Sequence, residues 1–567
     1  MGQHLGDFPT YEQMQEHNRL LGLIAGKDAS ASVLDSIIPA AINGENTTRL
    51  FWTWYAQAQD GSQDRYALLD RFFKGAALGW ADKTYTLQSY ADTVSTSSEM
   101  TPLDDLAGKT PGLLCTEASS SYTHWMDEDP MYWYIRANAL SLADGTMNIL
   151  YFEGESGFDI TGEIAPVYTF KMAKWVRQWS SGSYNYISWR TTPQSGYVPY
   201  AGDVDHSNEK RSMTWLPTFP GGLNAEGGLT SGAGKKPYNF NSANNGIVAA
   251  RKVSAHEGLW NDCDTIAALH DWQFRHFNLE NSNILEGCTN YQSQVTVAVA
   301  EEDVKRVVLT PEDGDKFIVG SNVEVGTHPE GTNTDRSTAA NKDLTSCAKI
   351  TSKETIEIDG VTYCALYLDL DSNITVPATG FVSTAPWDSG TTEEIPGHAD
   401  GCLYNLTNGK TPIRVGGVEY LDGAYTVGLD PLYDVTAGSD ADHFNYEVYE
   451  CRDSINLSGS ITSNYVDTGI GMTDVMKGWN YVKRFVNTRL GILFPEEFGG
   501  GSNQYYKSAF GGAASAGVRC PWRFGSLGHA GAAGLACELG YYSPSGASWD
   551  GRPRLSGSGK KRGEWTA

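Results

Sequence analysis

The end of the chain, GVRCPWRFGSLGHAGAAGLACELGYYSPSGASWDGRPRLSGSGKKRGEWTA (517–567), combines large aromatic residues with a background of Gly, Ala and Ser. Trp522 and Trp549 are spaced through it, and the pair Tyr541 and Tyr542 stands between them. A packed core needs contiguous bulky aliphatic residues, and a flexible linker does not carry Trp, Phe and Leu. Rigid aromatic anchors with adaptable Tyr, Ser and Gly between them are typical of a recognition surface. The alternative interpretation is a loop-rich end with scattered aromatic residues.

The overall composition indicates a globular protein built from strands and turns. Of the 567 residues, 40% are hydrophobic and 19% are charged, with 11% aromatic residues and 62 glycines. High aromatic and glycine contents favour short strands and exposed aromatic surface over a helical protein. The length is enough for roughly three or four domains.

The net charge of −26 argues against general binding to nucleic acid, because phosphate binding needs basic surface. The N-terminus has neither the basic region nor the apolar region of a signal peptide. No apolar run approaches the ~20 residues that span a bilayer. We therefore expect a protein that is made in the cytoplasm and does not insert into membranes.

The first half of the chain is expected to form a β-rich region over residues 1–290 that includes a short amphipathic helix. Its aromatic segments read as strands, and its Gly- and Asn-rich stretch reads as a long loop or arm. The patterns predict helices at 10–25 and 263–277, strands at 166–176 and 184–190, and the loop at 220–246.

Strict alternation of apolar and polar residues then predicts a small β-barrel or sandwich over 295–390. Its strongest hairpin has Asp359-Gly360 at the turn, since this dipeptide suits a type I′ turn. A second hairpin is predicted with its turn at Asp422-Gly423. The region 395–567 has few strands and long Gly- and Trp-rich loops, an α+β architecture that resembles C-type lectins.

No catalytic or metal-binding motif stands out. The segments 231–236 and 556–561 contain Gly-Lys but lack the first Gly and the Ser or Thr of a phosphate loop. An EF-hand-like segment has Ile374 where Gly is required. His270 and His276 are six residues apart and do not share a helix face, which favours structural roles over zinc binding. The nine cysteines include no C-x-x-C motif, so we expect reduced, buried thiols.

Five segments carry a resemblance to a known family, and together they extend from about residue 280 to the end. They are ILEGCTNYQSQVTVAVAEE (284–302), TPIRVGGVEYLDGAYTV (411–427), GILFPEEFGGGSNQYY (491–506), GVRCPWRFG (517–525) and AGLACELGYYSPSGASWDGRPRLSGSGKKRGEW (533–565). These segments resemble the variable proteins of diversity-generating retroelements, in particular those of temperate phages of gut bacteria. The resemblance implies a formylglycine-enzyme-like version of the C-type lectin fold. It also implies mutation restricted to template adenines.

The resemblance also implies which residues bind ligand. The positions that match the family's varied residues are Ser526, Gly528, His529, Tyr541, Tyr542, Ser545, Ser548 and Asp550. Trp522, Trp549 and Arg552 would be scaffold residues. Glu538 departs from the pattern, because Glu is not reached from an Asn codon by such mutations. Variable side chains should carry no folding energy and should face solvent and partner.

The function implied is that of a phage virion tail protein, a homotrimer that binds a host-surface receptor, protein or glycan, through its C-terminal domain. Residues 1–290 would attach it to other tail proteins, and 295–390 would act as a spacer. One alternative is a purely structural virion protein. A further alternative is an enzyme, either a polysaccharide depolymerase or an oxidase of the formylglycine-generating type, for which Cys520 and Cys537 are candidates by default. We predict no catalytic residue, metal or cofactor.

Overall fold

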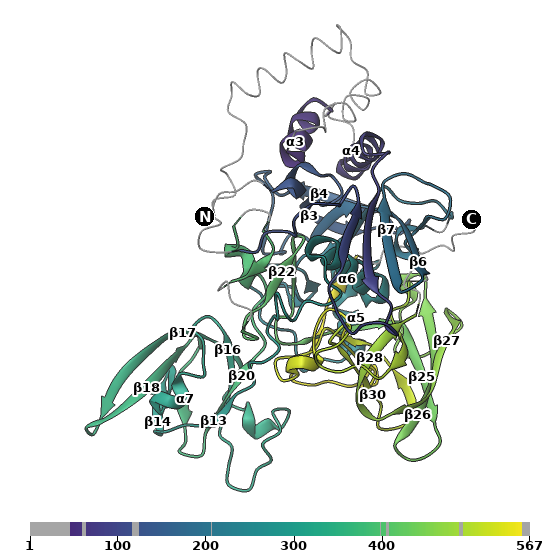
Figure 1. The fold of residues 1–567 in the computed structure, drawn as a ribbon. Coiled ribbons are helices and arrows are strands. Elements are labelled where there is room, and N and C mark those ends of the chain that lie inside the picture. Colours follow the sequence, from purple (N-terminus) through teal and green to yellow (C-terminus); the bar gives the residue numbers. More distant parts are fainter. Residues whose placement is uncertain are drawn as a thin grey trace.

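The computed structural model describes residues 46–58, 64–115, 124–205, 207–396, 399–403, 408–486 and 491–557 (Figure 1). Strands dominate these residues and are distributed over several sheets. This confirms the prediction of a mainly β chain with more than one sheet. The helix predicted at 10–25 lies outside the described residues.

Two helices cover a four-stranded sheet near the start of the described chain (Figure 1). The helices are α3 (Thr47–Ala58) and α4 (Arg65–Gly79), and the sheet has the order β4 (Met147–Phe152), β3 (Tyr134–Ser141), β5 (Val167–Met172), β9 (Met213–Pro217). The Asp64 carboxylate caps α4 by accepting a hydrogen bond from the Ala67 amide at 2.6 Å. Phe51, Phe72 and Trp133 pack between helices and sheet, so this layer has an aromatic core.

A five-stranded antiparallel sheet lies beside this layer. Its order is β2 (Thr101–Asp104), β1 (Tyr85–Tyr90), β7 (Tyr184–Arg190), β6 (Trp175–Ser181), β8 (Val198–Pro199). Leu87, Val176 and Ile187 turn one face into a buried cluster. The strands predicted at 166–176 and 184–190 are confirmed, with the first divided between β5 and β6.

The segment predicted as a loop at 220–246 is more ordered than its composition indicates. It contains β10 (Gly222–Leu223), β11 (Leu229–Thr230) and the start of α5 (Ala243–Val253). A Cβ at Gly221 would collide with the Pro553 carbonyl, and one at Gly232 with the Thr161 carbonyl. The glycines therefore permit close backbone packing here.

The predicted helix at 263–277 is confirmed as α6 (Asp262–His276), which follows β12 (Gly258–Asn261). The Asn261 side chain caps it by accepting a hydrogen bond from the Asp264 amide at 3.0 Å. Ile266, Leu269 and Phe274 are buried, as their spacing predicts.

Residues 294–385, which we call the middle module, form a separate lobe (Figure 1). A six-stranded sheet has the order β13 (Gln294–Thr296), β20 (Phe381–Ala385), β16 (Asn322–Gly326), β17 (Thr345–Ile358), β18 (Val361–Leu368), β15 (Arg306–Leu309), and β14 (Glu301–Val304) pairs with β19 (Ile374–Val376). Its edge strands do not pair along their length, so the described strands form no closed barrel. The other form predicted for this region, a sandwich, stays a prediction. The Asp359-Gly360 turn is confirmed, with φ values of 53° and 76°.

The predicted hairpin turn at Asp422-Gly423 is wrong. β22 (Ile413–Val415) pairs with β23 (Val418–Tyr420), so the hairpin turns at Gly416-Gly417, where φ is 52° and 81°. The Asp422 carboxylate instead forms a buried ion pair with Arg552. A tertiary contact thus overrides the local turn signal.

A nine-stranded mixed sheet forms the C-terminal region. Its order is β29 (Pro495–Phe498), β28 (Gly478–Phe485), β30 (Ala509–Gly512), β33 (Glu538–Leu539), β32 (Trp522–Arg523), β24 (Tyr425–Asp430), β12, β35 (Leu555–Ser556), and β34 (Gly551–Pro553) also pairs with β24. β12 comes from the region predicted as 1–290, whereas its partners come from 395–567. One sheet therefore contains strands from both of these predicted regions.

Smaller elements complete the described chain. A four-stranded sheet has the order β27 (Tyr465–Met476), β26 (His443–Cys451), β25 (Leu432–Ala437), β31 (Gly517–Arg519), and β21 (Gly401–Cys402) pairs with β22. The short helices are η1 (Trp125–Glu128), η2 (Ala201–Asp203), α7 (Pro311–Gly314), η3 (Ala339–Asn341), η4 (Thr391–Glu394), η5 (Ser454–Asn456) and η7 (Ala530–Ala532).

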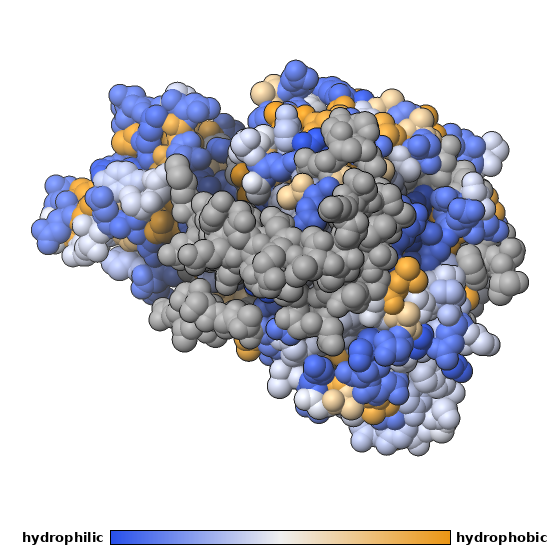
Figure 2. Space-filling model, turned by 90° about the horizontal axis from the view of Figure 1, so that it is seen from above, coloured by the Kyte–Doolittle hydropathy of each residue, from blue (hydrophilic) through white to orange (hydrophobic). Residues whose placement is uncertain are grey.

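The surface seen from above is mainly hydrophilic, with hydrophobic residues in separate patches (Figure 2). None of the helices in the described ranges is both long and apolar enough to cross a membrane.

Candidate functional site

One row of paired residues crosses the C-terminal sheet. Trp479 on β28 pairs with Gly511 on β30, and Gly511 pairs with Leu539 on β33. Leu539 pairs in turn with Trp522 on β32. Directly paired residues project from the same face of a sheet. Gly511 leaves room for its neighbours, because a Cβ there would meet both Leu539 and Trp479. The result is a continuous apolar row, with Trp479 37% exposed near its edge.

The opposite face of the same strands carries a buried charge cluster. Arg523 and Glu538 are paired across β32 and β33 and form an ion pair at 2.7 Å. Arg523 also contacts the carboxylate of Asp262 at the start of α6, and Tyr433 donates a hydrogen bond to Glu538. The three charged side chains are each about 1% exposed. This cluster connects the site to the helix behind it.

Burial governs the protonation of this cluster. It raises the pKa of Asp262 to about 7, although Arg523 acts in the opposite direction. It also raises the pKa of Glu538, again against the effect of Arg523. Burial by itself lowers the pKa of Arg523, but Asp262 and Glu538 hold that pKa above its usual value. The charges are therefore stable in the interior only as a group.

Stacked aromatic rings extend the row toward the solvent. Tyr542 stacks on Trp522 with ring centroids 4.1 Å apart and an interplanar angle of 24°. Tyr541 meets Tyr542 edge-on at 5.1 Å and is 42% exposed. Such pairs stabilise a fixed ring arrangement beyond simple burial. The exposed ring of Tyr541 thus packs on the half-buried ring of Tyr542, which in turn stacks on the buried Trp522.

The backbone that carries these rings, the terminal loop (540–549), is held at several points. The Cys520 amide donates a hydrogen bond to the Tyr542 carbonyl at 3.1 Å, and the Asn244 amide donates one to the Pro544 carbonyl at 3.1 Å. Anchored loops bind with a smaller entropy cost than mobile ones. The terminal loop is therefore a suitable platform for side chains that contact a partner.

A polar cluster lies beside the row. The Ser526 hydroxyl donates a hydrogen bond to Asp550 at 3.2 Å and lies 2.7 Å from His529 Nδ1. The other ring nitrogen of His529 lies 3.1 Å from the Tyr425 hydroxyl. Burial lowers the pKa of His529, so the ring is neutral near pH 7. The serine stands between the acid and the histidine, whereas a hydrolytic triad needs the histidine in the middle.

The eight predicted ligand-binding residues divide by burial. Gly528, Tyr541 and Ser545 are exposed, His529 and Tyr542 are half-buried, and Ser526, Ser548 and Asp550 are buried. The expectation that all of them face solvent is therefore wrong for three positions, because two of these, Ser526 and Asp550, bond to each other. Whether any of the eight binds a ligand stays a prediction.

The interpretation of this stretch as a recognition surface also needs correction for its described part, residues 517–557. Several apolar side chains in it are buried, namely Phe524, Leu527 and Leu535. Trp522, for which the resemblance implies a scaffold role, is buried as well. Sequence reasoning missed Trp479 and Leu539 as members of the row. An aromatic residue in the polar strand sequence GWNYVKRF (478–485) was the available signal for Trp479.

The middle module adjoins one side of this region. The Arg336 guanidinium lies 4.3 Å from the centre of the Trp549 ring, a cation–π contact. Asn290, next to the module, forms an antiparallel bridge with Gly528. The middle module therefore borders the terminal loop at Trp549, whereas Tyr541 and Ser545 of that loop are exposed.

A buried carboxyl marks this junction. Glu324 is fully buried, and neither of its oxygens has a hydrogen-bond partner among the described residues. Burial raises its pKa to about 8, against the attraction of Arg336 and Lys342, and Asp550 raises it further. At neutral pH the group is therefore largely protonated.

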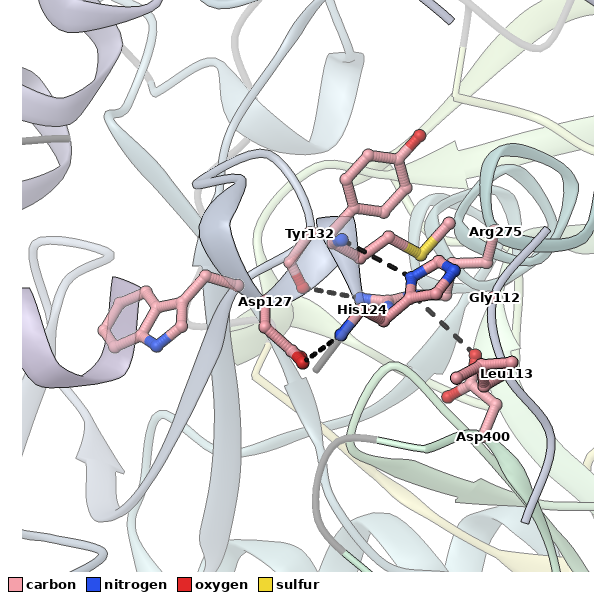
Figure 3. A pocket seen from close by; sticks show the side chains of 9 residues that line it. Gly112, Leu113, His124, Asp127, Tyr132, Arg275 and Asp400 are labelled. Atoms are coloured by element: carbon pink, nitrogen blue, oxygen red, sulfur yellow. Dashed lines mark hydrogen bonds and ion pairs between the residues drawn. The ribbon is translucent and has the colours of Figure 1, made fainter. Parts of the chain in front are cut away.

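A separate pocket lies between η1, α6 and the segment before η1 (Figure 3). Arg275 donates a hydrogen bond to the Tyr132 carbonyl at 2.7 Å, and Asp400 lies 3.0 Å from His276 Nε2. His124 caps η1, and burial lowers its pKa. These groups bond to one another and connect the surrounding segments, which indicates a structural role for the pocket.

Metal and thiol chemistry find little support in the described ranges. No group of three or more His, Cys, Asp or Glu residues there is arranged to hold a metal ion. Cys520 and Cys537 are not joined in a disulfide. Burial raises the pKa of Cys520 to about 12 and that of Cys537 well above its usual value. Thiols in such surroundings are poor nucleophiles.

A scan of known protein-family models finds none that matches this chain, and a search of curated proteins finds no match either.

Proposed function

We propose that this chain is a phage virion tail protein that binds a host-surface receptor through its C-terminal region. The observation that carries the proposal is a pair of exposed aromatic side chains held on an anchored backbone: Trp479 lies in the apolar row, and Tyr541 packs against Tyr542, which stacks on Trp522 of the same row. Rigid aromatic side chains give large contact area at low entropy cost. Interfaces of this kind concentrate binding energy in a few aromatic residues.

We further propose that a diversity-generating retroelement varies the exposed part of this site. Tyr541, Ser545 and Gly528 are exposed, so substitutions there remove few internal contacts. Asp550, by contrast, is buried and hydrogen-bonded to Ser526. Variation should therefore be concentrated at the exposed positions, and a binding surface can change while the fold does not.

The proposal includes a C-type-lectin-like fold of the formylglycine-enzyme type for the C-terminal region. Short strands joined by long loops are consistent with it. It also includes a homotrimer attached to other tail proteins through the N-terminal region, because several weak sites on one particle raise avidity. Sedimentation velocity of the purified chain tests the trimer.

The first experiment measures binding to host cells. Trp479→Ala and Tyr541→Ala should each lower the affinity at least tenfold, as expected for a central aromatic contact. Val361→Ala is the matched control, because Val361 is 51% exposed but lies on the distant hairpin of the middle module. Unchanged binding by both aromatic variants would contradict the proposal.

The second experiment is deep sequencing of codons 511–567 in a propagated phage or lysogen population. Substitutions should occur at Tyr541, Ser545 and Gly528 and should be confined to adenines of a nearby repeat. The buried Asp550 should vary less. An invariant stretch would remove the retroelement from the proposal.

The alternative is a purely structural virion protein. The burial of Ser526, Ser548 and Asp550, and the contact of Trp549 with the middle module, favour it over a fully open binding face. A virion that assembles normally with the Tyr541→Ala variant but no longer attaches to cells would argue against this alternative.

A further inference from the structure

A second cavity lies inside the N-terminal region, where residues of β5, β7, β9, η2 and α6 meet. Its volume is about 40 Å³. A buried water needs roughly 10–15 Å³ of such volume, so the cavity has room for about three water-sized groups. Met172, Trp189 and Leu216 line it and are buried, which gives it apolar walls. The cavity can therefore hold a molecule of a few non-hydrogen atoms.

Several polar groups around the cavity bond to one another. The Lys171 ammonium donates a hydrogen bond to the Asp271 carboxylate at 2.7 Å, and Arg275 donates one to the other oxygen of that carboxylate at 3.1 Å. The Tyr200 hydroxyl lies 2.7 Å from His270 Nδ1. The Asp271 carboxylate thus serves two cations already, so it is not available to pair with a third.

Two charged side chains of the cavity lack such partners. Lys174 is 6% exposed and Asp203 is 4% exposed, and both line the cavity. Neither the Lys174 ammonium nor the Asp203 carboxylate has a hydrogen-bond or ion-pair partner among the described residues. The ammonium lies 4.6 Å from the centre of the Trp189 ring, a contact that leaves its N–H groups without acceptors. Buried charges without partners are costly, so an occupant of the cavity should complement both.

The charges of these two groups define that occupant. Burial lowers the pKa of Lys174 to about 8, although Asp271 and Asp203 act in the opposite direction. The ammonium form therefore predominates at neutral pH. A bound anion alone would leave Asp203 without a partner, and a bound cation alone would leave Lys174 without one. A molecule with a carboxylate and an ammonium group satisfies both at once.

We propose that this cavity binds a small free amino acid, of the size of glycine or alanine, as its zwitterion. The carboxylate of the ligand accepts hydrogen bonds from Lys174, and its ammonium group donates to Asp203. Hydrogen bonds between charged groups are stronger than neutral ones, which favours the zwitterion over ordered water, the alternative occupant. The site lies outside the C-terminal region, and the proposal goes beyond receptor binding and does not depend on it.

The test is isothermal titration calorimetry of the full chain at pH 7 with glycine, L-alanine, acetate and methylammonium. Glycine or L-alanine should bind at one site per chain. Acetate and methylammonium should bind at least tenfold more weakly, because each complements only one of the two charges. Lys174→Met and Asp203→Asn should each lower the affinity for the amino acid at least tenfold. Lys316→Met, at an exposed lysine of the middle module, is the control and should bind as the unchanged protein does.

Three outcomes would overturn the proposal. The first is the absence of binding by both amino acids, which would assign the cavity to water. The second is binding of acetate as tight as that of glycine, which would make the cavity a site for an anion alone. The third is full affinity in folded Asp203→Asn, a nearly isosteric change that keeps the test decisive if Lys174→Met does not fold. Circular dichroism shows whether each variant is folded.

Discussion

The C-terminal residues contain two regions that are adjacent in sequence and opposite in role. Arg523 and Glu538 are buried and tied to Asp262, so they hold the sheet to α6. Tyr541 and Ser545 follow within a few positions, yet they are exposed on the terminal loop. The difference teaches that neighbouring residues in this stretch belong either to the buried interior or to the exposed loop, so substitutions at the exposed positions should disturb the interior least.

Removing the positive charge of Arg523 should have the largest effect on stability. Arg523→Leu would leave Asp262 and Glu538 buried without their cation, so we expect a loss of about 3–5 kcal/mol in the free energy of unfolding. Urea denaturation measures it. Arg177→Leu, at an exposed arginine, is the control and should change stability by less than about 0.5 kcal/mol. A small loss of stability in Arg523→Leu would mean that the buried charge cluster contributes no more to stability than the exposed terminal loop does.

The junction with the middle module should make stability depend on pH. The pKa of Glu324 is about 8 in the folded protein and near 4.5 when unfolded. The folded state therefore binds more protons between these values, and stability falls as the pH rises from about 4.5 to 8. The expected contribution over this range is about 4 kcal/mol. Denaturation midpoints measured across this range should show that Glu324→Gln flattens the dependence; an unchanged slope would contradict the assignment.

Tyr542 lies at the boundary of the two regions and should show both kinds of effect. Tyr542→Ala removes the ring stacked on Trp522, so we expect a loss of about 1–2 kcal/mol in stability together with weaker cell binding. Tyr542→Phe keeps the stacked ring and should keep the stability. Thermal denaturation distinguishes the two variants. Equal losses for both would assign the effect to the hydroxyl.

The exposed ring should show the smallest effect on stability. Tyr541→Ala should change the free energy of unfolding by less than about 0.5 kcal/mol, because the side chain is 42% exposed and packs only edge-on. The same variant should lose cell binding. A stability loss comparable with that of Tyr542→Ala would mean that the Tyr541 side chain contributes to the stability of the fold.

Local patterns in the sequence were sufficient where the structure depends on neighbours along the chain. The helix α6 and the Asp359-Gly360 turn are such cases, since capping and turn geometry are local. The hairpin turn predicted from the identical dipeptide Asp422-Gly423 is wrong, because the Asp422 carboxylate forms an ion pair with Arg552, which lies far along the chain. No local pattern distinguishes the two dipeptides.

The candidate site was harder to predict for the same reason. The pairing of Arg523 with Asp262 spans 261 positions, and the row from Trp479 to Trp522 is assembled from four strands. The family resemblance predicted ligand-binding positions in the terminal loop but did not separate exposed from buried positions. Gly- and Ala-rich sequence around Trp and Arg can be a core, because small residues allow these large side chains to be enclosed.

The middle module leaves and rejoins the rest of the chain at one place. The Ser293 amide donates a hydrogen bond to the Thr384 hydroxyl at 3.0 Å, and the Thr384 amide donates one to the Ser293 carbonyl at 2.9 Å. In genetic terms, a segment whose two ends meet behaves as a cassette. Recombination can insert, delete or exchange it between lineages at a single pair of crossover points, while the path of the remaining chain is inherited unchanged.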